Sequence, residues 1–291
     1  MARCMKGRMK AMRTGLVLEG GAMRGMYTTG VVDAFLDHGV KVDSLMGVSA
    51  GALFGANLLS GQRSRALRYN KRFMGDPRYM SLRSLLTTGD FVNKEFAFYR
   101  VSNELDPYDE AAFEAYGASF TAVVTNVDTG EGEYLDIANV LEQMEVFRAT
   151  SALPYISRMV EIDGKRYLDG GLTDSIPVRA MMDRGVDKVI VVLTRPRDYR
   201  KKPDHAPLAN LVYAGYPNLR RALRTRPERY NAQCEEVAQL EREGKVFVIR
   251  PDSALDIGRL EKDPARLQAV YDRGLADANA AMEALQAYLR S

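Results

Sequence analysis

The chain contains few of the residues that build metal centres and disulfide frameworks. Its 291 residues include only two histidines, two cysteines and no tryptophan. Neither His38 nor His205 lies within metal-ligand spacing of a cysteine or of the other histidine, so we expect no metal site and no cofactor. Cys4 and Cys234 cannot build a disulfide framework, which favours a reducing compartment. Any catalytic mechanism must therefore use very little imidazole.

The sequence also lacks an apolar run long enough to span a bilayer. The longest weakly polar run, residues 45–59, has 15 residues, whereas a spanning helix needs about 20. The first thirteen residues hold five Lys/Arg and no acid, and no apolar signal-peptide core follows them. We therefore expect a cytoplasmic protein with a basic, disordered tail at 1–13. Weak attachment of the tail to anionic lipid at the inner face of the membrane is the alternative.

Strand and helix patterns alternate along a chain of ordinary globular composition, with 46% hydrophobic and 27% charged residues. β-Rich runs at 14–18 and 40–46 are each followed by a helical pattern, at 26–38 and 50–60. Further strands are predicted at 119–125, 132–135, 158–162, 165–168, 186–193 and 245–249. This alternation is typical of βαβ units, so the sequence predicts an α/β fold with a mainly parallel sheet.

Helix boundaries and domain limits follow from the same patterns. Helices are expected to begin at Asp106-Pro107, Thr225 and Asp263-Pro264, where capping signals occur. The apolar stripe of the last helix should pack on the sheet. The irregular, aromatic-rich stretch 75–105 should mostly join the core, with a lid as the alternative. No linker divides the chain, so we expect one domain over 14–291, with the motifs in 14–193 and a C-terminal extension at 194–291.

A G-x-S-x-G motif covers residues 47–51, between a predicted strand and a predicted helix. The serine of this motif sits on a sharp turn that presents its hydroxyl, and glycines at both ends let neighbouring backbone pass closely. N–H groups at the start of the next helix, including that of Ala50, point at developing negative charge. The motif predicts Ser49 as a nucleophile flanked by Gly47 and Gly51. A plain small-residue turn is the alternative.

Two further glycine-rich turns follow predicted strands. The turn at 20–25 offers free N–H groups in a concave arrangement that suits an oxyanion. It matches neither G-x-x-x-x-G-K-[ST] nor G-x-G-x-x-G, which argues against nucleotide binding. The other turn is Asp169-Gly170-Gly171, which places a carboxylate after a short strand. Because strand ends in an open α/β sheet converge on one face, we expect the three motifs to meet there.

Taken in order, these motifs resemble the patatin-like phospholipase family, bacterial type. The resemblance rests on Arg24-Gly25 closing the first turn, on Ser49, and on Asp169-Gly170-Gly171, with 120 residues between Ser49 and Asp169. Residues 149–154 also resemble a stretch that precedes the aspartate motif in that family. The likeness covers about residues 14–193. One departure is Ala22, where the family usually has a third glycine; alanine keeps its N–H but disfavours a positive φ.

The resemblance implies a three-layer α/β/α sandwich and a serine acyl hydrolase that cleaves fatty-acyl esters of phospholipids or lysophospholipids. It assigns Ser49 and Asp169 to a catalytic dyad. The oxyanion hole would use the N–H groups of Gly20, Gly21, Ala22, Met23, Arg24, Gly25 and Ala50. The chain order Ser49, Asp169, His205 also allows a triad carboxylesterase acting on soluble esters. A non-catalytic lipid-binding protein that retains the site as a scaffold is a further alternative.

Basic residues are concentrated at 195–229, with ten Lys/Arg against three acids. Five of them follow a predicted strand end on the expected catalytic face: Arg195, Arg197, Arg200, Lys201 and Lys202. A cationic rim there would hold an anionic head group or dock on an anionic bilayer, whereas the alternative is a solvated surface. No nucleic-acid-binding motif accompanies the charge, so we expect a lipid and not a nucleic acid as partner.

Overall fold

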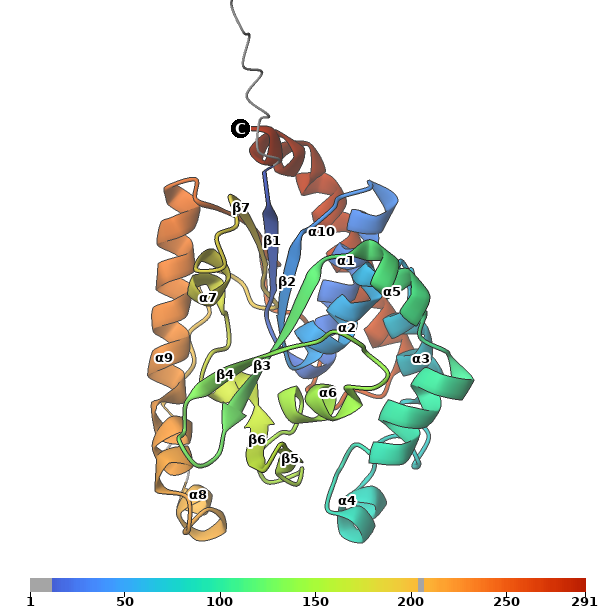
Figure 1. Cartoon of the computed structure of the whole chain (residues 1–291), viewed down its shortest axis with the longest axis vertical. Coiled ribbons are helices and arrows are strands. Elements are labelled where there is room, and N and C mark those ends of the chain that lie inside the picture. The colour runs from blue at the N-terminus through green and yellow to red at the C-terminus, as the bar shows by residue number, and fades with distance from the viewer. Residues whose placement is uncertain (1–11, 204–206) are drawn as a thin grey trace, which may run out of the picture.

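A sheet of eight strands crosses the computed structural model, which describes residues 12–203 and 207–291 (Figure 1). The strand order is β5-β6-β3-β2-β1-β7-β8, and β4 also pairs with β3. The strands are β1 (Thr14–Leu18), β2 (Ser44–Val48), β3 (Ser119–Asn126), β4 (Gly132–Asp136), β5 (Val160–Ile162), β6 (Lys165–Asp169), β7 (Lys188–Val192) and β8 (Val246–Ile249). The strands β3, β2, β1, β7 and β8 are parallel, whereas β4, β5 and β6 are joined by antiparallel pairings. The prediction of a mainly parallel sheet is confirmed.

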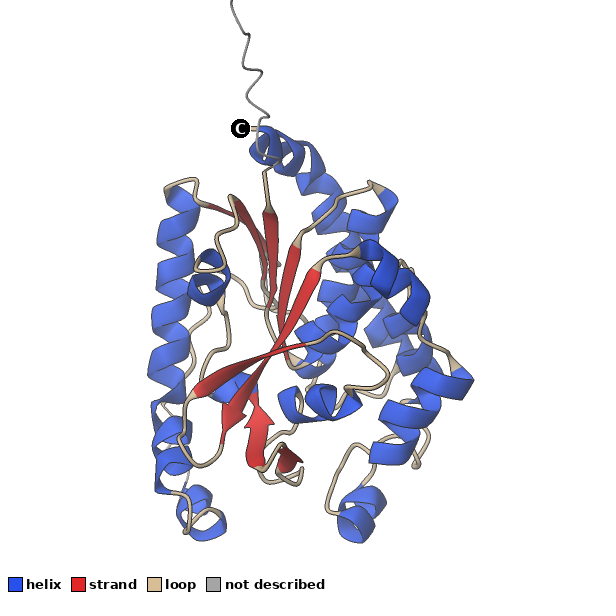
Figure 2. Ribbon diagram, in the orientation of Figure 1, coloured by secondary structure: helices blue, strands red, loops and turns tan. Residues whose placement is uncertain are grey.

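Helices cover both faces of this sheet (Figure 2). The helices of the described residues are η1 (Ala22–Arg24), α1 (Gly25–Asp37), α2 (Ala50–Leu59), α3 (Arg65–Phe73), α4 (Leu82–Thr88), η2 (Lys94–Leu105), α5 (Glu110–Tyr116), α6 (Met144–Thr150), η3 (Gly170–Leu172), α7 (Val178–Met182), α8 (Pro207–Val212), α9 (Pro217–Arg242) and α10 (Pro264–Arg290).

Alternating side chains of β1 divide the core into two layers. Leu16 and Leu18 pack with α1, α2 and α10, whereas Val17 points to the opposite face and packs with α7 and α9. All three side chains are fully buried. A strand with no exposed face reads as a continuous apolar run, which is typical of a parallel sheet covered on both sides. The three-layer α/β/α sandwich is therefore confirmed.

Several predicted boundaries are wrong; the strand predicted at 40–46, for example, is β2 at Ser44–Val48. Helix α9 begins at Pro217, eight residues before Thr225, and continues through Pro227; its buried residues already include Leu219 and Leu223 in the unpredicted first turns. Asp106-Pro107 begins no helix; Asp109 caps α5 by accepting a hydrogen bond from the Ala112 N–H. Residues 1–11 of the expected tail lie outside the described residues. Arg13 belongs to the fold, since its carbonyl accepts hydrogen bonds from Asp187 and Lys188.

Helix α10 packs chiefly against α1 rather than on the sheet as predicted. The two helices cross at a pair of glycines, Gly30 and Gly274, where their backbones approach closely. A β-carbon at Gly274 would collide with the carbonyl oxygen of Tyr27, and one at Gly30 with that of Tyr271. Neither glycine has a positive φ, so close approach and not backbone conformation requires glycine here.

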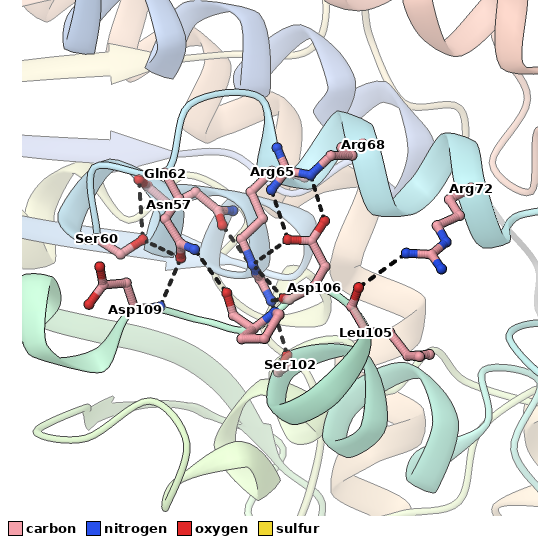
Figure 3. Close-up of polar contacts among 12 residues, drawn as sticks. Asn57, Ser60, Gln62, Arg65, Arg68, Arg72, Ser102, Leu105, Asp106 and Asp109 are labelled. Carbon is pink, nitrogen blue, oxygen red and sulfur yellow. Dashed lines mark hydrogen bonds and ion pairs between the residues drawn. The ribbon is translucent and has the colours of Figure 1, made fainter.

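The irregular segment 75–105 joins the core, as its aromatic content predicts. Tyr79, Phe91, Phe96 and Phe98 are buried in it. Beside this segment, a buried arginine ties three elements together (Figure 3). Arg65 donates two hydrogen bonds to the carbonyl oxygen of Asp106, at 3.0 and 2.6 Å, and one to Asn57 of α2 at 3.2 Å. Arg68 donates two hydrogen bonds to the Asp106 carboxylate, both at 2.8 Å.

Asp106→Ala is expected to lower the free energy of unfolding by about 3 kcal/mol, because it leaves the buried Arg65 guanidinium without its counter-charge. Urea unfolding followed by circular dichroism measures the change. Asp37→Ala is the matched control, because Asp37 pairs with Arg63 in solvent and should cost less than about 1 kcal/mol. Equal losses in the two variants would contradict a structural role for the Arg65 network.

Candidate active site

Ser49 occupies the turn between β2 and α2. Its backbone has φ 54° and ψ −126°, a conformation that residues with a β-carbon rarely adopt. The glycines on either side permit tight packing around this turn, since a β-carbon at Gly51 would collide with the carbonyl oxygen of Leu18, and one at Gly47 with the backbone of Ala52. The local sequence therefore produces the strained strand-to-helix turn that presents a serine hydroxyl.

Asp169 reaches Ser49 because β2 and β6 run toward each other along one edge of β3. Val48 pairs with Val123, and Asp169 pairs with the next residue, Val124. Strand β4 pairs with the same stretch of β3 as both β2 and β6, so it occupies the opposite edge. The two strands on the shared edge are thus collinear, and their carboxyl ends meet.

This arrangement differs from the one that the sequence predicts. The predicted convergence of parallel strand ends applies to β1, β2 and β7, which end at the turn 20–25, at Ser49 and at Thr194. Strand β6 is antiparallel to β3, so its carboxyl end points opposite to those of the parallel strands. It reaches the site only because its last residue, Asp169, pairs with Val124, directly beyond the point on β3 where the pairing of β2 ends. The expected meeting of the motifs thus has a different geometric cause.

The Asp169 carboxylate is buried and shares the polar cavity with Ser49. Its Oδ1 accepts a hydrogen bond from the Gly171 N–H at 2.7 Å. Burial raises the pKa of Asp169 above its ordinary value, and interactions with the Ser49 hydroxyl and the Gly171 N–H, together with the charges of Arg226 and Lys201, oppose that rise. A carboxylate with a raised pKa is a better proton acceptor than one exposed to water.

The glycine-rich turn 20–25 lies beside Ser49 and leaves several N–H groups free. The N–H groups of Gly20, Gly21, Ala22, Met23 and Ala50 have no hydrogen-bond partner within residues 12–203 and 207–291. Those of Arg24 and Gly25 are used within the turn, by the carbonyls of Gly21 and Ala22. Ala22 has φ 49°, so the chain adopts at this alanine the positive φ that a glycine would tolerate better.

Two supporting residues were not identified from the sequence. Thr150 Oγ1 accepts a hydrogen bond from the Ser49 N–H at 2.9 Å and donates one to the carbonyl of Val123 at 2.6 Å, which ties the serine turn to β3. Thr150 lies in the segment 149–154 that carried part of the family resemblance. Buried Glu19 accepts hydrogen bonds from the Thr194 N–H at 2.6 Å and from the Tyr230 hydroxyl at 2.8 Å. The one feature of the sequence that could have indicated Glu19 is its position directly after an apolar strand.

Two cavities meet at Ser49. A small cavity of about 60 Å³ is polar and contains Asp169, the turn 20–25 and several basic side chains. An apolar cavity of about 130 Å³ extends on the other side, between α2, η2 and α6. Ala22, Ser49, Leu153 and Arg259 line both cavities. The serine therefore lies at the boundary between a polar compartment and an apolar one.

The predicted basic rim divides into separate parts. Arg195 and Lys201 line the polar cavity, and Lys202 lines a groove outside it. Arg197 and Arg200 face a different cleft, where Arg200 pairs with Glu235 at 3.8 Å, so their proposed place at the site is wrong. The cavity instead gains three basic residues that the sequence analysis did not assign to a head-group site, Arg24, Arg226 and Arg259. These come from distant parts of the chain.

The histidine alternative depends on His205, which lies outside the described residues. His38 lies at the end of α1, where its Nε2 contacts Asn279 at 2.9 Å, and it lines neither cavity. Within the described ranges, no helix is both long enough and apolar enough to cross a bilayer.

Comparison with known proteins identifies the family. The profile of the patatin-like phospholipase family matches residues 16–182, more than half of the chain, and includes Ser49 and Asp169. The chain belongs to the patatin-like phospholipase family. A second profile, a domain of unknown function (DUF6363), matches residues 216–290, which form α9, β8 and α10.

Two relatives illustrate the similarity. YjjU of Escherichia coli K12, described as uncharacterized, is 27% identical over 188 residues, which cover 63% of this chain and 52% of that protein. Lysophospholipase NTE1 of Candida albicans is 27% identical over 186 residues, which cover 61% of this chain and 13% of the yeast protein. The chain thus spans about half of the first relative and a small part of the second. Human GIVD cytosolic phospholipase A2 has a TM-score of 0.45 at 12% identity, covering 96% of this chain and 59% of that chain.

Proposed function

We propose that this patatin-like protein is a serine acyl hydrolase that cleaves fatty-acyl esters of lipids, with Ser49 as nucleophile and Asp169 as general base. The observation that carries the proposal is that Ser49, on its strained turn, lines the same cavity as the buried Asp169 carboxylate and lowers the pKa of that group, at the point where the two cavities meet. Family membership supports it, and the relative named lysophospholipase supports a lipid ester as substrate.

Acylation begins with attack of Ser49 Oγ on the ester carbonyl carbon. As the Oγ–C bond forms, the hydroxyl proton moves to Asp169, and the carbonyl oxygen becomes an oxyanion. Free N–H groups of the turn 20–25 and of Ala50 would stabilise this oxyanion, a contribution of about 3 kcal/mol per donor. When the intermediate collapses, the alkoxy group leaves with the proton held by Asp169, and Ser49 remains acylated.

Deacylation repeats these steps with water. Asp169 accepts a proton from a water molecule as its oxygen attacks the acyl carbon, and the bond between the carbon and Ser49 Oγ then breaks. The same proton returns to Oγ, which regenerates the free serine, and the fatty acid is released. Both half-reactions require an unprotonated Asp169 at the start, and the raised pKa of this carboxyl increases its strength as a base.

The apolar cavity is suited to the acyl chain. Met23, Leu53, Phe54, Phe98 and Phe147 lie among its lining residues, which also include Ser49. Burying a methylene group in such surroundings is worth about 0.8 kcal/mol. The binding energy of the chain would therefore hold the ester carbonyl against Ser49 while its alcohol part points into the polar cavity.

Labelling with a fluorophosphonate probe tests this proposal. We expect the wild-type protein to be labelled at Ser49 at a stoichiometry near one, since the phosphorus takes the place of the acyl carbon. Ser49→Ala should lose the label completely, and intact-protein mass spectrometry measures it. Ser60→Ala, at the opposite end of the same helix, is the control that should retain labelling. Undiminished labelling of Ser49→Ala would exclude Ser49 as the nucleophile.

A further inference from the structure

Five basic side chains gather in the polar cavity beside Ser49. They are Arg24, Arg195, Lys201, Arg226 and Arg259, and the same cavity contains only two carboxylates, Glu19 and Asp169. They come from η1, the loop after β7, α9 and the loop before α10. Like charges are therefore brought together from four separate segments, which costs free energy unless an anion accompanies them.

None of these five basic side chains forms a direct ion pair with a carboxylate in the described part of the chain. No Asp or Glu oxygen of residues 12–203 and 207–291 lies within 4.0 Å of their charged nitrogens, although many basic residues elsewhere form such pairs. Glu19 is already occupied by Thr194 and Tyr230. The Nε of Arg24 is buried and has no hydrogen-bond partner there. The cluster thus has unused charge and at least one unused donor.

The charged groups affect one another strongly. Burial lowers the pKa of Lys201 to about 7, helped by repulsion from Arg226 and Arg24 and opposed by Glu19 and Cys234. Burial and repulsion from Arg195 and Arg259 also lower the pKa of Arg24. Lys201 is nevertheless held in place, because its ammonium lies 3.6 Å from the Tyr230 ring centroid and its backbone pairs twice with Asn231.

The groove that leads out of the cavity continues the same charge. Lys201, Arg226 and Arg259 line both the polar cavity and this groove, and Lys202 joins them farther out. The described residues that line the groove include no aspartate or glutamate. A head group that carries its own cation, such as choline or ethanolamine, would meet four basic side chains and no carboxylate along this groove. An anionic head group without a cation would meet complementary charge there.

We infer that the protein selects acyl esters whose alcohol part bears a phosphate monoester and no cation. This inference rests on the proposed function, because the acyl carbonyl must sit at Ser49 for the alcohol part to enter the polar cavity. A phosphate monoester carries close to two negative charges near neutral pH and presents several acceptor oxygens. Guanidinium groups match these oxygens with pairs of donors, so Arg24, Arg226 and Arg259 can together compensate both charges.

The segment matched by the domain of unknown function thereby acquires a role at the site. Residues 216–290 supply Arg226, Tyr230 and Arg259, whereas Ser49 and Asp169 lie in the patatin-like segment. Arg226 also donates a hydrogen bond to the carbonyl of Gly171 at 2.7 Å, which links it to the aspartate turn. Arg259 lines the polar cavity, the apolar cavity and the outer groove. The C-terminal segment would thus determine which head group the enzyme prefers, although the catalytic dyad lies in the patatin-like segment.

Three decanoyl esters with a common glycerol backbone test the inference: monodecanoyl glycerol phosphate, monodecanoyl glycerophosphocholine and monodecanoyl glycerol, each used below its critical micelle concentration. For the wild-type protein we expect kcat/KM to be at least about tenfold higher for the phosphate monoester than for either other ester. Arg259→Gln should lower that value by about tenfold or more, with less than about threefold change for monodecanoyl glycerol. Equal losses on the charged and neutral esters would overturn the inference.

Arg197→Gln is the matched control. Arg197 lies in the same loop as Lys201 but is exposed and lines a different cleft, so its removal should leave the ratio of kcat/KM values unchanged. A wild-type protein that hydrolyses all three esters through Ser49 without preference would overturn the head-group inference and leave the proposed function standing.

Binding to the Ser49→Ala variant separates the two claims, because it needs no chemistry. Isothermal titration calorimetry should show monodecanoyl glycerol phosphate binding at least about tenfold more tightly than the phosphocholine ester, and adding Arg259→Gln should abolish that difference. Selective binding without hydrolysis or fluorophosphonate labelling of the wild-type protein would refute the hydrolase and support the anion site. Equal binding of the two esters would refute the anion site.

Discussion

Asp169→Asn is expected to lower kcat/KM for ester hydrolysis by about 10²- to 10⁴-fold, the range attributable to a general base. The substitution keeps the size of the side chain, and its amide oxygen can still accept the hydrogen bond from the Gly171 N–H. It removes the group that takes the Ser49 proton. Steady-state kinetics on monodecanoyl glycerol measure the loss. Asp174→Asn is the matched control, since Asp174 is a partly buried carboxyl with a raised pKa that contacts Tyr134 and Gln233 outside both cavities.

The raised pKa of Asp169 gives this prediction two pH signatures. The kcat/KM of the wild-type protein should fall as the pH drops through the raised pKa, which lies above the ordinary value of about 3.9. The pKa of Asp169 is higher in the folded state than in the unfolded state, so protonated Asp169 favours folding and ionised Asp169 opposes it. The stabilisation by the protonated form is lost as the pH rises through the folded-state pKa. Asp169→Asn should therefore be no less stable than wild type at neutral pH. An unfolded variant, or one that keeps the wild-type acid limb of activity, would contradict the assignment.

Gly274→Ala is expected to lower the free energy of unfolding by about 3 kcal/mol or more, because its methyl group would enter the space of the Tyr27 carbonyl where α10 crosses α1. The collision is with backbone rather than with a flexible side chain, so relief requires separating two helices. Urea unfolding gives the free energy. Gly75→Ala is the control: its β-carbon meets no atom within 4 Å, and its φ is not positive.

The control should be neutral or stabilising by up to about 1 kcal/mol, since alanine restricts the unfolded chain. Gly30→Ala, on the facing helix, should resemble Gly274→Ala, and the double variant should lose less than the sum because both open the same crossing. A loss at Gly274 as small as that at Gly75 would contradict the close contact.

Features whose causes are local were predictable from the chain. The run 14–18 forms β1, the helix predicted at 26–38 is α1 to within one residue at each end, and Asp263-Pro264 begins α10. The G-x-S-x-G motif places Ser49 on its turn because Gly47 and Gly51 admit nearby backbone. Each of these depends on residues within a few positions of one another, where periodicity, capping and glycine act directly.

Features that join distant segments were predicted poorly. The sequence suggested that Asp169 would meet Ser49 by parallel convergence, whereas the meeting depends on an antiparallel β6 that replaces β2 along the edge of β3. Helix α10 was expected on the sheet but lies mainly on α1. An apolar stripe indicates that one face of a helix is buried, but it does not indicate which element packs against that face.

The sequence alone determined the α/β class, the serine turn and the family of the chain, because these follow from backbone preferences and short motifs. Only the tertiary structure decided which basic residues reach the site. The basic residues at 195–202 divide between the polar cavity, an outer groove and a separate cleft. Side chains of a loop follow no regular period, so the sequence does not show in which direction each one points. Arg24, Arg226 and Arg259 are far apart along the chain and become neighbours of Ser49 only when η1, α9 and the loop before α10 pack around it.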